Sequence, residues 1–258
     1  MRGSALDDDR WDDEIDVAVI GFGAAGAMAA IEAHDAGARV AIFEKMPDPG
    51  GLSIVSAGGI RVAFDKKAAY TYLKESCGGR TPDDLLDVLA DGMTTISTRV
   101  EELAKTSNAT VKVAPAVANY PLPGCDAFGY CEITNVPAIE GAASVHAVRG
   151  VRPGSRLFKV LEDNITQRGI PVHLNAPAER LIWRQGEGVR GVRVVRNGAS
   201  IQVKARKAVI LACGGFEANE DMKRQYFQAM PVLTGSFLGN TGDGITMAAD
   251  VGAALWHM

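Results

Sequence analysis

The residue pattern with the clearest chemistry lies near the N-terminus, where three glycines and a carboxylate are spaced for binding a dinucleotide. Gly21, Gly23 and Gly26 follow the pattern G-x-G-x-x-G, and Glu44 follows about 20 residues later. The first glycine permits a tight turn, the second lets a diphosphate approach the backbone, and the third allows a helix to pack closely on a sheet. A carboxylate at Glu44 can accept hydrogen bonds from a ribose diol and would repel a 2′-phosphate. The pattern therefore predicts dinucleotide binding and disfavours NADP.

The neighbouring sequence supplies the elements that must position these residues. Residues 15–20 form an apolar run rich in β-branched side chains, which predicts a buried parallel strand. A helix of small residues is expected from residue 24 to about residue 36, followed by a second strand over residues 39–43. The free N–H groups and the partial positive charge at the start of this helix favour phosphate. The alternative is a glycine-rich turn in an unrelated α/β protein.

A second glycine-rich stretch, residues 46–59, favours a flavin dinucleotide over NAD. It contains Gly-Gly-Leu-Ser at 50–53 and Ser-Ala-Gly-Gly at 56–59, where a simple nucleotide-binding fold would form another helix. A glycine-rich loop can lie flat against a ligand, and it would suit the ribityl chain and the isoalloxazine ring of FAD. An ordinary surface loop is the alternative.

The rest of the sequence predicts an α/β protein with a Rossmann-like parallel sheet and an inserted three-stranded antiparallel β-meander. Two helices are expected over about residues 82–105 and 156–168, with an irregular segment at 107–152 between them. In the first helix, apolar residues three or four apart, including Leu85 and Leu89, predict a buried stripe. The expected strands are 172–174, 180–183, 191–195, 201–204 and 208–212. The second to fourth of these form the meander.

These segments resemble those of the FAD-dependent family of fumarate reductases, succinate dehydrogenases and 3-ketosteroid dehydrogenases. The resemblance runs from about residue 15 to the end of the chain, and its segments are 19–26, 43–45, 50–51, 56–59, 208–216 and 239–244. It implies a Rossmann-like FAD-binding fold with FAD as the cofactor, and it does not fix the substrate. Because no histidine matches the covalent flavin attachment of the membrane-complex subunits, the resemblance implies non-covalent FAD.

The resemblance also implies which residues contact FAD. Ala25 matches an alanine that faces the diphosphate, Ala178 matches a backbone contact to adenine, and Asp243 matches an acidic contact. Leu52 replaces a polar residue that is often found in this family. The full set of expected cofactor-binding residues is Gly21, Gly23, Ala24, Ala25, Gly26, Glu44, Lys45, Gly50, Gly51, Leu52, Ser53, Ser56, Ala57, Gly58, Gly59, Ala178, Ala212, Gly214, Gly215 and Asp243.

The resemblance further implies an oxidoreductase that exchanges hydride between the flavin and a carbon–carbon bond beside a carbonyl or carboxylate. Substrates like 3-ketosteroids and substrates like fumarate both remain open, and the catalytic acid or base is unknown. Tyr120 and Tyr130 are candidates because they lie in the irregular segment that would face the substrate side of the flavin. The alternative is that both rings only pack within a covering loop.

The expected domains are an acidic leader at residues 1–14, a FAD-binding domain at 15–247 and the start of a capping domain at 248–258. Family members are much longer, so a second chain could supply the cap and the last flavin-binding segment. The alternative function is a non-catalytic nucleotide-binding module or an inactive fragment of such an enzyme. A downstream reading frame or partner chain that encodes the cap would favour the split enzyme.

Composition excludes several other classes of protein. The chain has 27 Lys and Arg against 31 Asp and Glu, so its formal net charge is −4, and no basic cluster suggests a nucleic-acid partner. No apolar run approaches the length of a membrane span, and the acidic N-terminus lacks the apolar core of a secretory signal. Four irregularly spaced cysteines predict no metal site. A cytoplasmic protein that acts on a small-molecule substrate is therefore expected.

Overall fold

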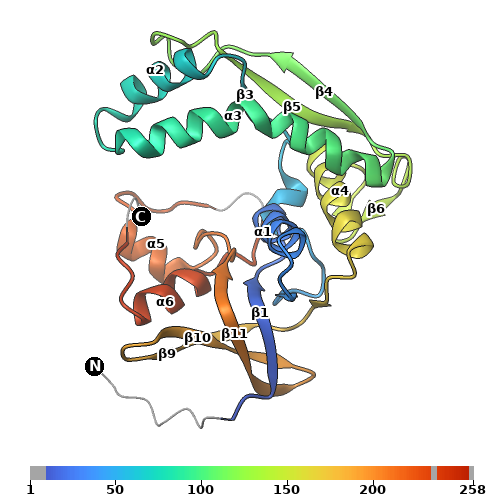
Figure 1. Ribbon diagram of the computed structural model, residues 1–258, viewed down its shortest axis with the longest axis vertical. Helices are drawn as coiled ribbons and strands as arrows, with labels where there is room; N and C mark the ends of the chain where they lie inside the picture. The colour runs from blue at the N-terminus through green and yellow to red at the C-terminus, as the bar shows by residue number, and fades with distance from the viewer. Residues whose placement is uncertain (1–9, 234–236, 256–258) are drawn as a thin grey trace. The chain divides into compact units, whose positions relative to one another are not determined.

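The computed structural model describes residues 10–233 and 237–255, and the chain divides into two compact units. The first unit combines Met1–Val55 with Asn164–Met258, and the second unit is the contiguous segment Ser56–Asp163. Figure 1 shows the elements of both units. The expected domain boundaries, with a leader, a FAD-binding domain and the start of a cap, stay predictions. Parts of the expected leader and cap lie outside the described residues.

A six-stranded sheet forms the centre of the first unit, in the order β8-β2-β1-β11-β10-β9. Its strands are β1 (Asp13–Ile20), β2 (Val40–Phe43), β8 (Val172–His173), β9 (Ala178–Arg184), β10 (Gly188–Arg196) and β11 (Ala199–Leu211). The strands β8, β2, β1 and β11 run parallel, whereas β9, β10 and β11 pair antiparallel. The predicted Rossmann-like sheet with its antiparallel meander is confirmed. β1 begins at Asp13, so the last two residues of the expected leader belong to the sheet.

Strand β11 belongs to both halves of this sheet. Residues 199–204 pair antiparallel with β10, and residues 203–211 pair parallel with β1. The sequence predicted two separate strands here, and that prediction is wrong. Lys204 and Arg206 both bind the carboxylate of Glu14 on β1, and the Lys204 ammonium lies 2.8 Å from it. These contacts tie the middle of β11 to β1, so the chain stays extended from the meander into the parallel part of the sheet.

Helix α1 (Ala24–Asp35) packs on β1 and β2 and completes the core beneath the glycine-rich turn. It buries Ala27, Ala30 and Ile31, and all four residues of β2 are buried. The other helical elements of this unit are the 3-10 turn η1 (Gly51–Val55) and the helices α5 (Glu220–Tyr226) and α6 (Asp243–Asp250). Across residues 10–233 and 237–255, no helix is long and apolar enough to cross a membrane.

The second unit contains a three-stranded antiparallel sheet in the order β3-β5-β4, with two helices packed together. The helices are α2 (Lys66–Cys77) and α3 (Asp83–Ala104), and α3 contacts all three strands. The strands are β3 (Ile60–Ala63), β4 (Thr110–Pro115) and β5 (Phe128–Asn135). Smaller elements are η2 (Lys105–Ser107) and the hairpin of β6 (Ser144–Val145) and β7 (Val148–Arg149), while α4 (Pro153–Gln167) spans the boundary of the two units.

Two expectations for the second unit are wrong in part. The segment 107–152 is not irregular throughout, because β4 and β5 lie within it. Cys131 and Ile133 of β5 are buried while Tyr130, Glu132 and Thr134 are exposed, which is the period-two pattern of a strand with one covered face. In α3, Leu85 and Leu89 are 57% and 50% exposed. Leu86 and Ala90 are the buried residues in this first part of α3. Further along the helix, the predicted stripe residues Val100 and Leu103 are buried as expected.

Candidate functional site

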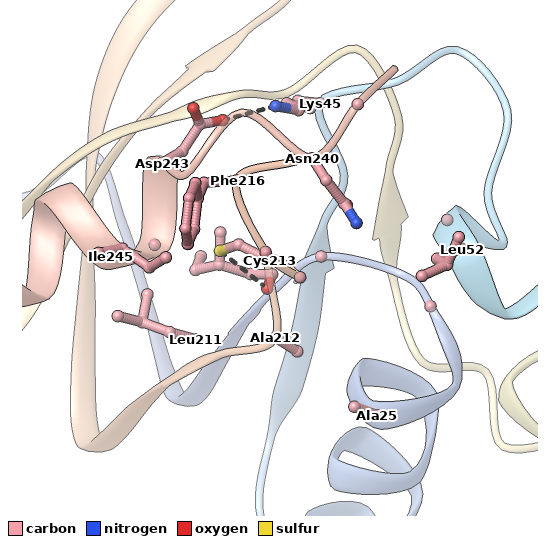
Figure 2. Close-up of a pocket in the computed structure, with 18 of the residues that line it drawn as sticks. Ala25, Lys45, Leu52, Leu211, Ala212, Cys213, Phe216, Asn240, Asp243 and Ile245 are labelled. Carbon is pink, nitrogen blue, oxygen red and sulfur yellow. Dashed lines mark hydrogen bonds and ion pairs between the residues drawn. The ribbon is translucent and has the colours of Figure 1, made fainter. Parts of the chain in front are cut away.

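A pocket of about 810 Å³ lies in the first unit, at the carboxyl ends of the parallel strands β1, β2 and β11. Its walls come from the glycine-rich turn after β1, from η1, from the segment after β11 and from α6. Figure 2 shows the side chains that face it. Ligands of open α/β sheets bind in such a crevice outside the carboxyl ends of the strands. The topology therefore places the pocket where a nucleotide is expected.

The glycine-rich turn is packed so tightly that no side chain fits at two of its glycine positions. Gly21 has a positive φ of 103°, and a Cβ atom there would lie 2.5 Å from the carbonyl oxygen of Ala212. A Cβ atom on Gly26 would collide with the carbonyl oxygen of Gly21. These contacts hold the start of α1 directly against the end of β1. The floor of the pocket is consequently made of backbone, which a diphosphate can approach closely.

The start of α1 presents backbone N–H groups to this floor. Gly23 occupies the N-cap position, and because glycine has no side chain, it does not cap the first N–H groups of the helix. The Ala24 N–H donates to the hydroxyl oxygen of Ser53, at 3.0 Å. This bond ties η1 to the start of α1. The helix N-terminus, with its partial positive charge, faces a pocket lined by Gly23, Ala24 and Ala25.

Glu44 lies at the end of β2, and its carboxylate is held in place by backbone N–H groups. The Phe22 N–H donates to one oxygen at 2.7 Å, and the Met46 N–H donates to the other at 2.8 Å. Glu44 is only 7% exposed and lines the pocket. Each carboxylate oxygen has a second lone pair that can accept a further hydrogen bond. The side chain is thus fixed in a position from which it can accept hydrogen bonds from hydroxyl groups.

Lys45, Thr241 and Asp243 form a triangle of short polar contacts beside Glu44. The Lys45 ammonium donates to Thr241 Oγ1 at 2.6 Å and to Asp243 Oδ2 at 2.7 Å. The Thr241 hydroxyl donates to Asp243 Oδ1 at 2.7 Å. Figure 2 shows the pair of Lys45 and Asp243 at the edge of the pocket. Sequence reasoning singled out Lys45 and Asp243 separately and missed Thr241, although it lies between two glycines of the same motif.

The segment after β11 and the segment before α6 are joined by hydrogen bonds. The Asn240 amide donates to Glu217 Oε1 at 2.6 Å, and the Gly242 N–H donates to the Gly215 carbonyl at 3.0 Å. Asn240 is 5% exposed, and both Glu217 and Asn240 line the pocket. Sequence reasoning assigned Gly214, Gly215 and Asp243 of these segments to the site but missed Glu217 and Asn240. Their position within the glycine-rich segments was the available signal.

Cys213 is another pocket residue that sequence reasoning missed. Burial, helped by the nearby carboxylates of Asp243 and Glu44, raises the pKa of its thiol to about 11. The thiol lies 3.5 Å from the carbonyl oxygen of Ile20, to which it donates. The group is therefore a protonated, weakly polar part of the pocket wall at neutral pH.

The structure brings most of the expected cofactor-binding residues into this one pocket. Those that line it are Gly21, Gly23, Ala24, Ala25, Glu44, Lys45, Gly51, Leu52, Ser53, Ala178, Ala212, Gly214, Gly215 and Asp243. Gly26 lies beneath the turn, and the Gly50 N–H donates to the Phe22 carbonyl at 2.8 Å. These two glycines shape the backbone around the pocket. Contact of each residue with FAD stays a prediction.

The remaining expected residues belong to the second unit. Ser56, Ala57, Gly58 and Gly59 precede β3, and a Cβ atom on Gly58 would lie 2.6 Å from the Pro153 carbonyl. The guanidinium of Arg61 lies over the ring of Tyr130 at 4.3 Å. Tyr120 is 62% exposed, and its N–H donates to the Tyr72 hydroxyl at 3.2 Å. Roles for these residues in cofactor binding or catalysis stay predictions.

The charged side chains of the pocket offer an anionic ligand little attraction, so such a ligand would be held mainly by backbone groups. Its charged side chains in the described residues are Glu44, Glu217, Asp243 and Lys45, and Lys45 is already paired with Asp243. A diphosphate would thus rely on the N–H groups of the glycine-rich turn and on the start of α1. A dinucleotide also matches the walls, which include both Ala178, the expected adenine contact, and Leu52, an expected flavin contact.

Comparisons with known proteins agree with this fit. An NADH:fumarate oxidoreductase from Klebsiella pneumoniae is 31% identical over 250 residues, which cover 94% of this chain and 25% of that protein. A 3-oxosteroid 1-dehydrogenase from Mycobacterium tuberculosis is 27% identical over 310 residues, which cover 94% of this chain and 55% of that protein. The crystal structure of 3-ketosteroid delta1-dehydrogenase from Sterolibacterium denitrificans superposes with a TM-score of 0.81 at 25% identity, over 94% of this chain and 55% of that one.

The chain therefore spans between a quarter and just over half of the length of these relatives. The resemblance to fumarate reductases and 3-ketosteroid dehydrogenases, first seen in the glycine-rich segments, is confirmed. Residues 16–258 match the model of the FAD-binding domain family. Because this match covers nearly all of the chain and the pocket fits a dinucleotide, the protein belongs to the FAD-binding domain family and its cofactor is FAD.

Proposed function

We propose that the chain is the FAD-binding part of an oxidoreductase that acts on a carbon–carbon bond beside a carbonyl or carboxylate. The observation that carries the proposal is the single pocket in which the glycine-rich turn, Glu44 and the segments around Gly214 and Asp243 meet. The relatives named above, which act on fumarate or on 3-oxosteroids, support the reaction class. Activity, substrate and partners of the whole protein are part of the proposal, since the chain spans only part of each relative.

In this proposal the chain binds and orients the cofactor. Glu44 accepts hydrogen bonds from the adenosine ribose, and the start of α1 with Ala25 faces the diphosphate. The backbone at Ala178 contacts adenine, and the loop at residues 50–53 continues toward the flavin. Bound FAD supplies a carrier that accepts or donates a hydride. We also propose that this FAD is non-covalent, so that it is released when the protein unfolds.

The substrate in this proposal is a small molecule with an activated carbon–carbon bond. A 3-ketosteroid and an unsaturated carboxylate both fit the reaction class, and the proposal does not choose between them. A positioned acid or base must move a proton at the carbon next to the one that exchanges hydride. Tyr120 and Tyr130 of the second unit are the candidates that this chain offers. A partner chain that supplies further groups is also part of the proposal.

The test is FAD binding by the full 258-residue chain and its Glu44 variants. We expect FAD to bind, and we expect Glu44→Gln to weaken binding by about 1–3 kcal/mol, because a charged acceptor for the ribose is lost. Glutamine keeps the acceptor for only one of the two N–H groups of Phe22 and Met46, so the melting temperature of this variant without FAD is measured as well, to separate a loss of folding stability from a loss of the ribose contact. Quenching of flavin fluorescence gives the dissociation constant.

Glu75 provides the matched control, because it is an exposed carboxylate on α2. Glu75→Gln should bind FAD like the unchanged protein. If the unchanged chain stayed colourless after incubation with excess FAD and removal of the unbound FAD, the proposed function would be wrong. An unaltered dissociation constant in Glu44→Gln would remove Glu44 from the site. A panel of ketosteroids and unsaturated carboxylates then tests the reaction class.

A further inference from the structure

We propose that Lys45 is a positioning residue of the FAD site, which acts by holding Asp243 and Thr241 instead of contacting FAD. The inference rests on the proposed function, since it requires FAD to bind in the pocket of the first unit. It assigns to Lys45 a task different from that of a cation that binds phosphate. The triangle of Lys45, Thr241 and Asp243 is the feature that carries it.

The first argument is that both carboxylate oxygens of Asp243 are already engaged within the chain. Lys45 occupies one oxygen at 2.7 Å, and the Thr241 hydroxyl occupies the other at 2.7 Å. Lys45 also donates to Thr241 at 2.6 Å, so three groups hold one another. A carboxylate bound from both sides keeps one orientation. Two of the three N–H donors of the Lys45 ammonium are directed at Asp243, the first residue of α6, and at Thr241, two residues before it.

The second argument is electrostatic. Three of the four charged side chains that line the pocket are carboxylates, and a diphosphate would add further negative charge. Pairing with Lys45 neutralises Asp243. Asp243 is also the first residue of α6, where the helix dipole favours an ionised carboxylate. Without Lys45, the Asp243 carboxylate would keep only its hydrogen bond from Thr241 and would be less restrained from turning toward the anionic ligand.

The third argument is that the triangle fixes a wall of the pocket. Gly244, Ile245 and Met247 of α6 line the pocket, and α6 starts at Asp243. Lys45 follows β2, so the triangle fastens the start of α6 to the end of a central strand. The side chains of Lys45 and Asp243 are 26% and 39% exposed. Partly exposed ion pairs contribute little to folding stability, so the expected effect lies in ligand binding.

The test is a double-mutant cycle with Lys45→Met and Asp243→Asn, read as the FAD dissociation constant. We expect Lys45→Met to weaken FAD binding roughly 10- to 100-fold, the range for a lost charged hydrogen bond. In the Asp243→Asn background, the same Lys45 substitution should change affinity less than about 3-fold, because its partner is gone. Lys45→Arg should keep most of the affinity, because a guanidinium can donate to both Asp243 and Thr241.

Equal losses in both backgrounds would show that Lys45 contacts FAD directly and would overturn the inference. So would an unchanged dissociation constant in Lys45→Met. The melting temperature of each variant without FAD is the second readout, and we expect it to stay within about 3 °C of the unchanged protein. If Lys45→Met fails to fold, Thr241→Val removes two of the three contacts of the triangle and should also weaken FAD binding.

Lys74→Met is the matched control, because Lys74 pairs with Asp83 at 2.8 Å on the exposed surface of the second unit. It should leave FAD affinity unchanged. The unchanged chain separates the two proposals. If it fails to bind FAD, the proposed function falls and the inference falls with it. If it binds FAD and the cycle is additive, only the inference about Lys45 falls.

Discussion

The cysteine side chains illustrate how burial decides the reactivity of single residues in this protein. Burial raises the pKa of the Cys213 thiol to about 11, and it also raises the pKa of the Cys131 thiol. Backbone N–H groups of the turn after α2, with that of Thr81 contributing most, lower the pKa of the exposed Cys77 thiol. The thiolate is the reactive form of cysteine, so these shifts set an order of reactivity.

We expect iodoacetamide at pH 7.5 to modify Cys77 first and Cys213 hardly at all. Because the pKa of Cys213 lies near 11, its thiolate fraction and its alkylation rate should rise as the pH increases from about 9 toward 11. Peptide mass spectrometry after timed quenching measures both rates. Added FAD should slow the alkylation of Cys213 further, since this residue lines the pocket. Equal rates for Cys77 and Cys213 at pH 7.5 would contradict the assigned burial.

Helix α1 and the turn before it build the pocket only because they pack in close contact. Gly26 lies inside α1, and its missing side chain lets the helix touch the backbone of Gly21. Gly92 lies inside α3, where a Cβ atom would meet nothing within 4 Å. The two glycines share a helical environment and differ in what surrounds them. Alanine substitutions at the two positions therefore separate the effect of packing on stability from the effect of helix propensity.

We expect Gly26→Ala to lower the free energy of unfolding by roughly 1–3 kcal/mol, because an overpacked contact forces the backbone apart. It should also weaken FAD binding. Gly92→Ala should instead raise the free energy of unfolding by about 0.5–1 kcal/mol, because alanine restricts the unfolded chain and favours helix. Urea denaturation followed by circular dichroism measures both changes. A stable Gly26→Ala variant with normal FAD affinity would show that the tight turn is not required.

Much of the first unit could be predicted from sequence, because its parallel strands are short apolar runs joined by glycines with defined tasks. The antiparallel sheet of the second unit could not, because β4 and β5 are separated by prolines and glycines that suggest an irregular segment. In α3, Leu85 and Leu89 follow the same spacing as Leu86 and Ala90. Spacing alone does not tell which of two apolar stripes is covered. Thr241, Glu217 and Asn240 were missed because their roles depend on partners far away in the sequence.

The whole molecule consists of a discontinuous first unit and a contiguous second unit. The pocket lies entirely within the first unit, whereas the expected flavin contacts at Ser56–Gly59 lie in the second. The sequence resemblance assigns both sets of residues to one cofactor. The resemblance therefore predicts that both sets of residues contact FAD when it is bound, and this prediction can be tested without knowing the substrate.

We expect FAD to slow amide hydrogen exchange both at residues 21–26 and at residues 56–59. Bound ligand protects the backbone that it contacts, and a ligand at 100 times its dissociation constant stabilises its binding state by about 2.7 kcal/mol. Exchange followed by mass spectrometry, with and without FAD, measures the two segments in one experiment. The exposed start of α3 serves as an internal reference that should not change. Protection confined to residues 21–26 would remove residues 56–59 from the cofactor site.

The pairing of β1 with β11 has a consequence for synthesis on the ribosome. Residues 17–20 are made early, but their partners at 208–211 emerge only after the whole second unit has been translated. The contiguous second unit can satisfy its own contacts in the meantime, whereas β1 waits with one edge unpaired. Such long-range pairings form slowly, and unpaired edges invite aggregation. The first unit therefore starts before the second unit in the nascent chain and is completed after it.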